Sequence, residues 1–339
     1  MKTQLIRINS SNKNKVLSLA ADLIKKGDVV AFPTETVYGL GANALDENAV
    51  KKIFVAKGRP NDNPLIVHIS NINQLNELVE FVPKKAEILI KKYWPGPLTI
   101  VMKKSFKIPM CITGGLNTVA IRMPSDNNAL ELIKKSGCPI AAPSANSSTK
   151  PSPTMAKHVM NDLNGKIPLI IDGGKCKVGL ESTVIGLSND KAILFRPGKI
   201  TKEEIGRLIG KVDLPCEQSK IPSSPGMKYK HYSPKAKITL VEAKINTNKK
   251  GTDFLNVVKK FSLNESNDLI GIISFTKRVG FENEFFFNKS VNLYAKNLFF
   301  VLREFDKRGL KKIIVEGVND NGFGLALMNR LRKASSKII

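Results

Sequence analysis

The feature that most constrains the fold is the alternation of short apolar segments with amphipathic segments along most of the chain. Residues 13–26 carry apolar side chains at helical spacing and stop at Gly27, and residues 28–33 form a short β-branched run. The same alternation predicts helices over residues 46–57, 83–93, 127–136, 154–163 and 202–209, and strands over residues 64–69, 98–102, 119–123, 139–143, 169–172, 183–187 and 193–196. This order is typical of an α/β domain with a twisted, mixed sheet and flanking helices.

The periodicity stops between residues 212 and 237, where prolines and Gly226 accumulate. A chain of 339 residues also exceeds the size at which one core usually stops growing. Beyond the break, predicted strands at 237–242, 269–274 and 311–316 alternate with predicted helices at 252–261, 293–307 and 323–334. We therefore expect a domain over residues 1–212, a linker over 213–236 and a smaller, doubly wound α/β domain over 237–339.

Composition narrows the class of protein. With 42% hydrophobic and 24% charged residues, the chain can form packed cores, which excludes a disordered or fibrous protein. No apolar run approaches the roughly 20 residues that span a bilayer, and the first 15 residues lack a secretory signal, so we expect a cytoplasmic protein without membrane contact. The four cysteines form no Cys-x-x-Cys pair, which argues against a zinc site or a disulfide framework.

The net charge of +25 attracts anions such as nucleotides or RNA. Much of this excess comes from single lysines in a chain that is also rich in Asn and Ile, a bias that genome composition alone is sufficient to produce. A solvated basic surface and a nucleic-acid-binding patch therefore both remain open.

Hydroxyl and carboxyl groups cluster just after the first predicted strand of the main domain. Thr34, Glu35, Thr36 and Tyr38 lie in residues 32–41, at the end of a strand where open α/β sheets bind ligands. Neither a Walker A loop nor a Gly-x-Gly-x-x-Gly loop is present to bind phosphate. The alternative is an ordinary turn from a strand into a helix.

Two cations, Lys57 and Arg59, lie at the end of the helix predicted over residues 46–57, and Asn63 comes shortly afterwards. Arginine offers a planar fork for phosphate oxygens and lysine a mobile point charge, so the pair suits a polyphosphate. The alternative is simple compensation of the dipole at the helix C-terminus.

Two polar side chains interrupt apolar strands. His68 stands in the strand predicted over residues 64–69, where a lone histidine is more often a satisfied core residue. Arg122 lies between apolar residues of the strand at 119–123, and a buried guanidinium requires an anion. That anion is either an internal Asp or Glu or the carboxylate of a substrate.

Polar groups also gather after the strand predicted at 139–143. Ser144 and Asn146 follow it, and Ser152 and Thr154 lead into a helix, so that together they form a possible anion cradle. Plain helix capping by Ser152 or Thr154 explains part of this pattern equally well. Because no catalytic triad, metal cluster or paired carboxylates stand out, the residues indicate charge positioning around a phosphorylated ligand.

The order of these segments resembles the YrdC-like threonylcarbamoyl-AMP synthase family in its long form. The resemblance rests on Phe-Pro-Thr-Glu-Thr-Val-Tyr-Gly-Leu-Gly from Phe32, Lys-Gly-Arg-Pro from Lys57, Asn-Pro-Leu-Ile-Val-His from Asn63, Ala-Ile-Arg-Met-Pro from Ala120, Ala-Pro-Ser-Ala-Asn from Ala142 and Arg-Pro-Gly from Arg196. The segments 224–234 and 322–331 resemble the long form specifically. The resemblance implies a YrdC-like catalytic domain with a Rossmann-like C-terminal domain.

The resemblance also implies substrates and site residues. The expected reaction joins L-threonine, bicarbonate or CO₂ and ATP into threonylcarbamoyl-AMP, which a downstream tRNA threonylcarbamoyl transferase uses; Mg²⁺ would accompany ATP. By resemblance, Lys57, Arg59 and Arg122 are catalytic. Residues expected to bind L-threonine are Thr36, His68, Arg122, Ala142 and Ser182; residues expected to bind ATP are Arg59, Asn63, Thr118, Ser144, Ser152, Arg196 and Tyr232, with His231 beside Tyr232 in a strap over the site.

Two other classes compete with this interpretation. A non-catalytic module that binds double-stranded RNA or tRNA suits the net charge but does not require Arg122 inside a strand. A carbamoyl-transfer enzyme that shares the domain resembles a longer chain with zinc-finger Cys pairs, which this sequence lacks. Direct contact of this chain with tRNA stays open.

Overall fold

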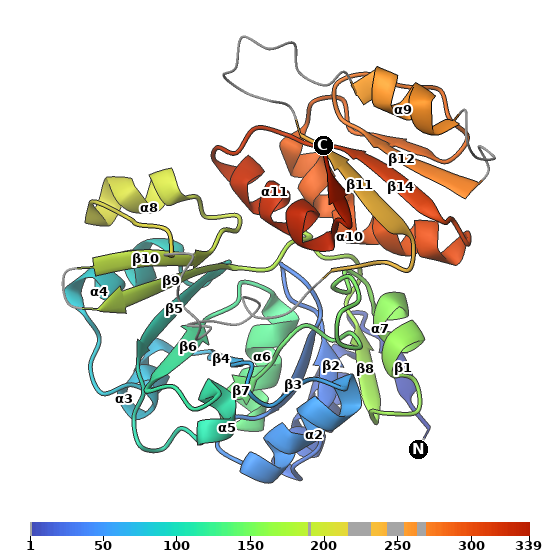
Figure 1. The fold of residues 1–339 in the computed structure, drawn as a ribbon. Helices are drawn as coiled ribbons and strands as arrows, with labels where there is room; N and C mark the ends of the chain where they lie inside the picture. Colours follow the sequence, from blue (N-terminus) through green and yellow to red (C-terminus); the bar gives the residue numbers. More distant parts are fainter. Residues whose placement is uncertain (1, 189–190, 216–231, 243–253, 263–268) are drawn as a thin grey trace. The chain divides into compact units, whose positions relative to one another are not determined.

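The computed structural model describes residues 2–188, 191–215, 232–242, 254–262 and 269–339, and these form two compact units (Figure 1). One unit comprises Met1–Ser148 and Ser152–Tyr229, and the other comprises Thr149–Pro151 and Lys230–Ile339. Each unit has its own sheet. Most of the linker that we predicted over 213–236 lies outside the described residues.

The first unit contains a ten-stranded mixed sheet in the order β1-β8-β2-β3-β7-β4-β6-β5-β9-β10. The strands are β1 (Gln4–Arg7), β2 (Val30–Phe32), β3 (Gly39–Asn43), β4 (Ile66–His68), β5 (Leu98–Lys103), β6 (Thr118–Arg122), β7 (Ile140–Ala141), β8 (Leu169–Asp172), β9 (Thr183–Ser188) and β10 (Lys191–Arg196). The predicted mixed sheet is therefore confirmed.

The strand directions decide which ends of strands meet. β4 runs parallel to β6 and ends beside it, so that His68 pairs with Arg122. β5 runs antiparallel to β6, and β9 runs parallel to β5, with Leu98 opposite Thr183. The C-terminal end of β6 therefore lies where β5 and β9 begin, which brings Arg122 to the residues just before those two strands.

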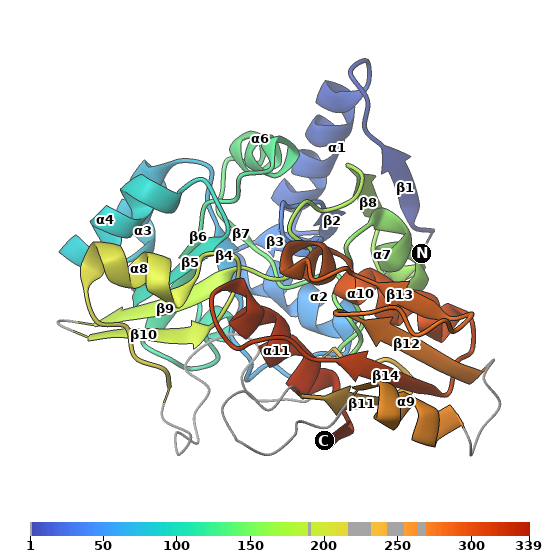
Figure 2. The same ribbon diagram turned by 90° about the horizontal axis from the view of Figure 1, so that it is seen from above.

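Helices α1 (Lys13–Lys25) and α6 (Asn127–Ser136) lie side by side (Figure 2). Their apolar residues form one core with β2, β7 and β8, in which Leu17, Ile24 and Leu132 are fully buried. Gly27 adopts φ 74° just beyond α1, a conformation that suits glycine after a helix. The other helices of this unit are η1 (Ile72–Gln74), α2 (Glu47–Lys57), α3 (Leu75–Leu78), α4 (Lys84–Tyr93), α5 (Met110–Thr113), α7 (Ala156–Leu163) and α8 (Lys202–Ile209).

Two sequence interpretations are corrected. The segment from Gly39 is strand β3, which pairs antiparallel with β2, and not a turn into a helix. Helix α7 begins at Ala156 with Met155 as its N-cap, and no side chain caps it. Capping by Ser152 or Thr154 therefore does not explain the polar residues before this helix.

The second unit has a five-stranded sheet in the order β13-β12-β14-β11-β15, and every pair of neighbours is parallel. Its elements are β11 (Lys237–Val241), α9 (Phe254–Ser262), β12 (Ile270–Ser274), β13 (Glu284–Phe286), α10 (Val291–Lys307), β14 (Lys312–Glu316), α11 (Phe323–Ala334) and β15 (Lys337–Ile338). Ile270 and Ile272 of β12 pack against helix α9 on one face of the sheet. Gly271, which lies between them, points to the other face, where a Cβ would meet Phe305 of α10 at 2.9 Å. The sheet is thus covered on both faces (Figure 2), as the doubly wound prediction required.

Candidate active site

The buried guanidinium of Arg122 is the centre of one group of predicted site residues. Its Nη2 lies 2.6 Å from Oε1 of Glu35, its Nη1 donates to Oγ1 of Thr36 over 2.9 Å, and its Nε donates to the Gly96 carbonyl over 3.2 Å. The side chains of Arg122 and Glu35 are only 4% and 6% exposed. The internal anion that the sequence left open is therefore Glu35.

His68 belongs to the same group through its pairing with Arg122 at the ends of β4 and β6. Burial lowers the pKa of His68 to about 3, and the positive charge of Arg122 contributes to this shift. Its Nδ1 has no hydrogen-bond partner among the described residues. His68 is therefore a neutral imidazole at physiological pH, and it is not a fully satisfied core histidine.

A second group forms around the start of β9. The hydroxyl of Ser182 lies 2.7 Å from that of Thr99 and accepts a hydrogen bond from Nη2 of Arg196 over 3.1 Å, while Nε of Arg196 donates to the Ser182 carbonyl over 3.0 Å. Ser152 donates to Glu181 over 2.5 Å. A residue predicted for threonine, Ser182, thus directly contacts a residue predicted for ATP, Arg196.

Lys57 forms a third group with the loop that follows β7. Although it is the last residue of α2, its side chain is 3% exposed, and its Nζ donates to the carbonyls of Ser144 and Asn146 over 2.5 and 2.6 Å. The Ser144 hydroxyl donates to Oδ1 of Asn146 over 2.6 Å. Compensation of the helix dipole therefore does not account for Lys57, since it bonds to another loop.

Arg59 and Asn63 lie together before β4. Nη2 of Arg59 donates to the Asn63 carbonyl over 3.3 Å, and Asn63 is buried. Thr118 begins β6 and is half-buried, so it lies at the opposite end of that strand from Arg122. Ala142 is buried just after β7 and donates its backbone N–H to the Ile66 carbonyl over 2.9 Å.

Tyr232 belongs to the second unit. Its ring stacks on that of Phe299 at a centroid distance of 5.2 Å, and the guanidinium of Arg330 lies 5.7 Å from its centroid. His231 lies outside the described residues. The proposed strap over the site therefore stays a prediction.

Sequence reasoning missed the roles of Glu35 and Glu181. The need of Arg122 for an anion was a signal for an acidic partner, but it did not say which residue. No signal in the sequence pointed to Glu181 as the acceptor for Ser152. Among the described residues, no three His, Cys, Asp or Glu side chains are grouped to hold a metal ion.

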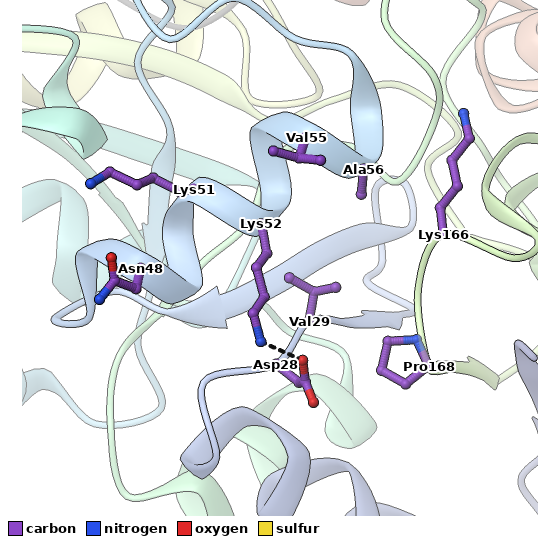
Figure 3. A pocket seen from close by; sticks show the side chains of 9 residues that line it. All are labelled: Asp28, Val29, Asn48, Lys51, Lys52, Val55, Ala56, Lys166 and Pro168. Carbon is purple, nitrogen blue, oxygen red and sulfur yellow. Dashed lines mark hydrogen bonds and ion pairs between the residues drawn. The ribbon is translucent and has the colours of Figure 1, made fainter. Parts of the chain in front are cut away.

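A hollow of about 600 Å³ lies elsewhere on the first unit, between α2 and the residues that precede β2 and β8 (Figure 3). Lys51, Lys52 and Lys166 line it together with apolar residues such as Val55, and Lys52 bonds to Asp28 over 2.6 Å. None of the predicted site residues lines this hollow. It is therefore distinct from the three groups above.

Comparison with known proteins covers both units. Residues 22–198 match the family described as telomere recombination, and residues 200–336 match the family described as the threonylcarbamoyl-AMP synthase C-terminal domain. A threonylcarbamoyl-AMP synthase of Pyrococcus abyssi is 48% identical over 98% of each chain. The chain belongs to the threonylcarbamoyl-AMP synthase family. The resemblance drawn from the sequence motifs is thus confirmed, and the family is one of enzymes of the nucleotidyltransferase type.

A second relative and a solved structure agree over nearly the same length. A threonylcarbamoyl-AMP synthase of Bacillus subtilis is 44% identical over 96% of this chain and 94% of its own. A crystal structure of Pyrococcus abyssi Sua5 complexed with L-threonine superposes with a TM-score of 0.91 and 46% identity, covering 99% of each chain.

Within the described residues, no helix combines the length and apolar character that crossing a membrane requires.

Proposed function

We propose that this chain forms L-threonylcarbamoyl-AMP and pyrophosphate from L-threonine, bicarbonate or CO₂ and ATP. The observation that carries the proposal is the buried cluster of Arg122, Thr36 and His68, which offers an amino acid a cation, a hydroxyl and a neutral imidazole. The threonine complex of the Pyrococcus abyssi relative supports the choice of amino acid. The product would serve threonylcarbamoyladenosine formation next to the anticodon of ANN-decoding tRNAs, through a downstream transferase.

The proposed reaction has two steps. The amine of threonine attacks the carbon of CO₂ or bicarbonate to form a carbamate, with loss of a proton or of water. An oxygen of that carbamate then attacks the α-phosphorus of ATP, and the bond to the β-phosphate oxygen breaks to release pyrophosphate. Neither step requires a nucleophile from the protein, so the residues act by positioning and by electrostatic stabilisation.

The cations divide this work. Arg122 would hold the threonine carboxylate, and Arg59 would face the triphosphate and stabilise the charge that develops as pyrophosphate leaves. Lys57, whose buried Nζ donates to the Ser144 and Asn146 carbonyls, would hold that loop for ATP and add its positive charge there. Arg196 would lie between the two substrates, because it already bonds to Ser182. The remaining residues assigned to ATP are Asn63, Thr118, Ser144, Ser152 and Tyr232.

Mg²⁺ would enter with ATP. Magnesium is commonly held by substrate phosphates with one or two carboxylates, so ATP itself would supply most of its ligands. When bound, the ion screens the charge of the triphosphate.

The test measures pyrophosphate release from ATP and Mg²⁺ in a two-by-two design, with and without L-threonine and with and without bicarbonate. Release that needs both compounds supports the proposal. Arg122→Ala should abolish threonine-dependent release, whereas Arg7→Ala, which removes an exposed arginine of β1, should leave it unchanged. Folded wild-type protein that shows salt-sensitive RNA binding but no threonine-dependent release would instead favour the RNA-binding module.

A further inference from the structure

The carboxylate of Glu35 is buried without enough hydrogen-bond donors. The side chain is 6% exposed, and Oε1 lies 2.6 Å from Nη2 of Arg122. Neither carboxylate oxygen accepts a hydrogen bond of good geometry from the described residues. Because buried carboxylates are costly unless they are both paired and hydrogen-bonded, the Glu35 carboxylate has acceptor capacity that its ion pair with Arg122 leaves unused.

The acidic neighbour Asp126 does not share this deficit. Asp126 caps helix α6, and its Oδ1 accepts from the backbone N–H groups of Asn128 and Ala129 over 2.9 and 3.1 Å. Burial raises the pKa of Asp126, and the charge of Glu35 raises it further. Asp126 thus has its hydrogen-bond donors, whereas neither oxygen of the Glu35 carboxylate accepts a hydrogen bond among the described residues.

Arg122 retains free donors beside this acceptor. A guanidinium has five N–H groups, and three contacts are described for Arg122: with Glu35, with Thr36 and with the Gly96 carbonyl. The two side chains therefore present an unused acceptor of negative charge next to unused donors of positive charge. An α-amino acid carries the complementary groups, an ammonium and a carboxylate, on one carbon atom.

We propose that Glu35 receives the α-ammonium group of the amino acid substrate while Arg122 receives its carboxylate. This inference rests on the proposed function, because it concerns the same amino acid. Glu35 then makes the site selective for α-amino acids and fixes the nitrogen, which attacks carbon after the ammonium group has released one proton to solvent. In the absence of substrate, the pairing of Glu35 with Arg122 keeps both charges compensated.

The test compares the binding of three ligands to wild-type protein and to Glu35→Gln by calorimetry. The ligands are L-threonine, 3-hydroxybutanoate, which lacks the amine, and threoninol, which lacks the carboxylate. In Glu35→Gln, loss of a charged hydrogen bond should weaken the binding of L-threonine and of threoninol roughly 10- to 100-fold. The affinity for 3-hydroxybutanoate should stay the same or increase, because the Glu35 carboxylate no longer competes with the ligand carboxylate for Arg122. Arg122→Lys should show the opposite selectivity: the affinity for 3-hydroxybutanoate should decrease, and the affinity for threoninol should stay the same.

A purely structural role of Glu35 predicts a different pattern. The affinities for all three ligands would then decrease in equal proportion, and that result would overturn the inference. ATP binding is the control for correct folding of Glu35→Gln. If that variant does not fold, Glu35→Asp keeps the charge but shortens the side chain, and the same selective loss of L-threonine and threoninol is expected.

The outcomes also separate this inference from the proposed function. Wild-type protein that binds L-threonine with the expected selectivity but releases no pyrophosphate would overturn the function and leave the role of Glu35 intact. Intact pyrophosphate release with equal losses for the three ligands would overturn only the role of Glu35. Wild-type protein that binds no L-threonine would overturn both.

Discussion

Removing one partner of the ion pair between Glu35 and Arg122 should strongly destabilise the first unit. The two side chains are 6% and 4% exposed and lie 2.6 Å apart, so removing either partner leaves a charge in a region with little water. Breaking such a pair costs about 3–5 kcal/mol, whereas replacing both charges by apolar side chains is often close to neutral. We therefore expect Arg122→Met and Glu35→Met each to lower the free energy of unfolding by about 3–5 kcal/mol, and the double variant to lose much less than their sum.

Urea unfolding followed by tryptophan fluorescence provides the assay. The chain contains one tryptophan, Trp94, which is 7% exposed in the first unit and therefore reports the unfolding of that unit. For a domain of this size, each single change corresponds to a decrease of roughly 6–20 °C in Tm. Single changes that cost less than about 1 kcal/mol, or that add fully in the double variant, would refute the reasoning, because they would show that the two charges are not coupled.

Three other predictions concern separate parts of the unit. Lys57→Met should lower the rate of threonine-dependent pyrophosphate release at least about 10-fold, because the buried Nζ of Lys57 holds the loop after β7. The control is Lys51→Met, at an exposed position of the same helix, which should leave the initial rate unchanged. The pKa of His68 is about 3 in the folded protein and 6.5 in the unfolded chain, so between these pH values only the unfolded state binds the extra proton. The free energy of unfolding, measured with urea, should therefore be about 2 kcal/mol lower at pH 5 than at pH 8. His68→Gln should remove that part of the pH dependence. Gly198→Ala would place a Cβ 2.3 Å from the backbone nitrogen of Thr183, so thermal unfolding should begin at a clearly lower temperature.

Most helices and strands of the first unit were predictable from local pattern. Helices α6 and α8 have the predicted bounds, and α1 ends one residue early, because their apolar stripes and terminal residues agree with one another. Strand β1 was not predicted because it is short and mostly exposed at the edge of the sheet. Strand β3 was not predicted because its two glycines are typical of a turn. Gly41 instead leaves room for the ring of Phe32, since a Cβ at position 41 would lie 2.7 Å from that ring.

The candidate site was predictable as a set of residues but not as a set of contacts. That Arg122 needs an anion follows from its apolar neighbours, and this holds for any fold that buries it. That the anion is Glu35 depends on a loop 87 positions earlier in the chain reaching the end of β6, which no local pattern encodes. The contact of Ser182 with Arg196 likewise depends on the antiparallel pairing of β9 with β10.

The pairing of β1 with β8 has a consequence for synthesis on the ribosome. Gln4 lies opposite Leu169, so β1 pairs with a strand that is made much later in the synthesis of the same sheet. At about 5–20 residues per second, the nascent N-terminal segment waits on the order of 10–30 s for its partner. During that interval helix α1, whose buried face includes Leu17 and Ile24, has no complete sheet to cover. The buried face of α1 is therefore exposed to proteases and to aggregation until residue 172 has left the exit tunnel.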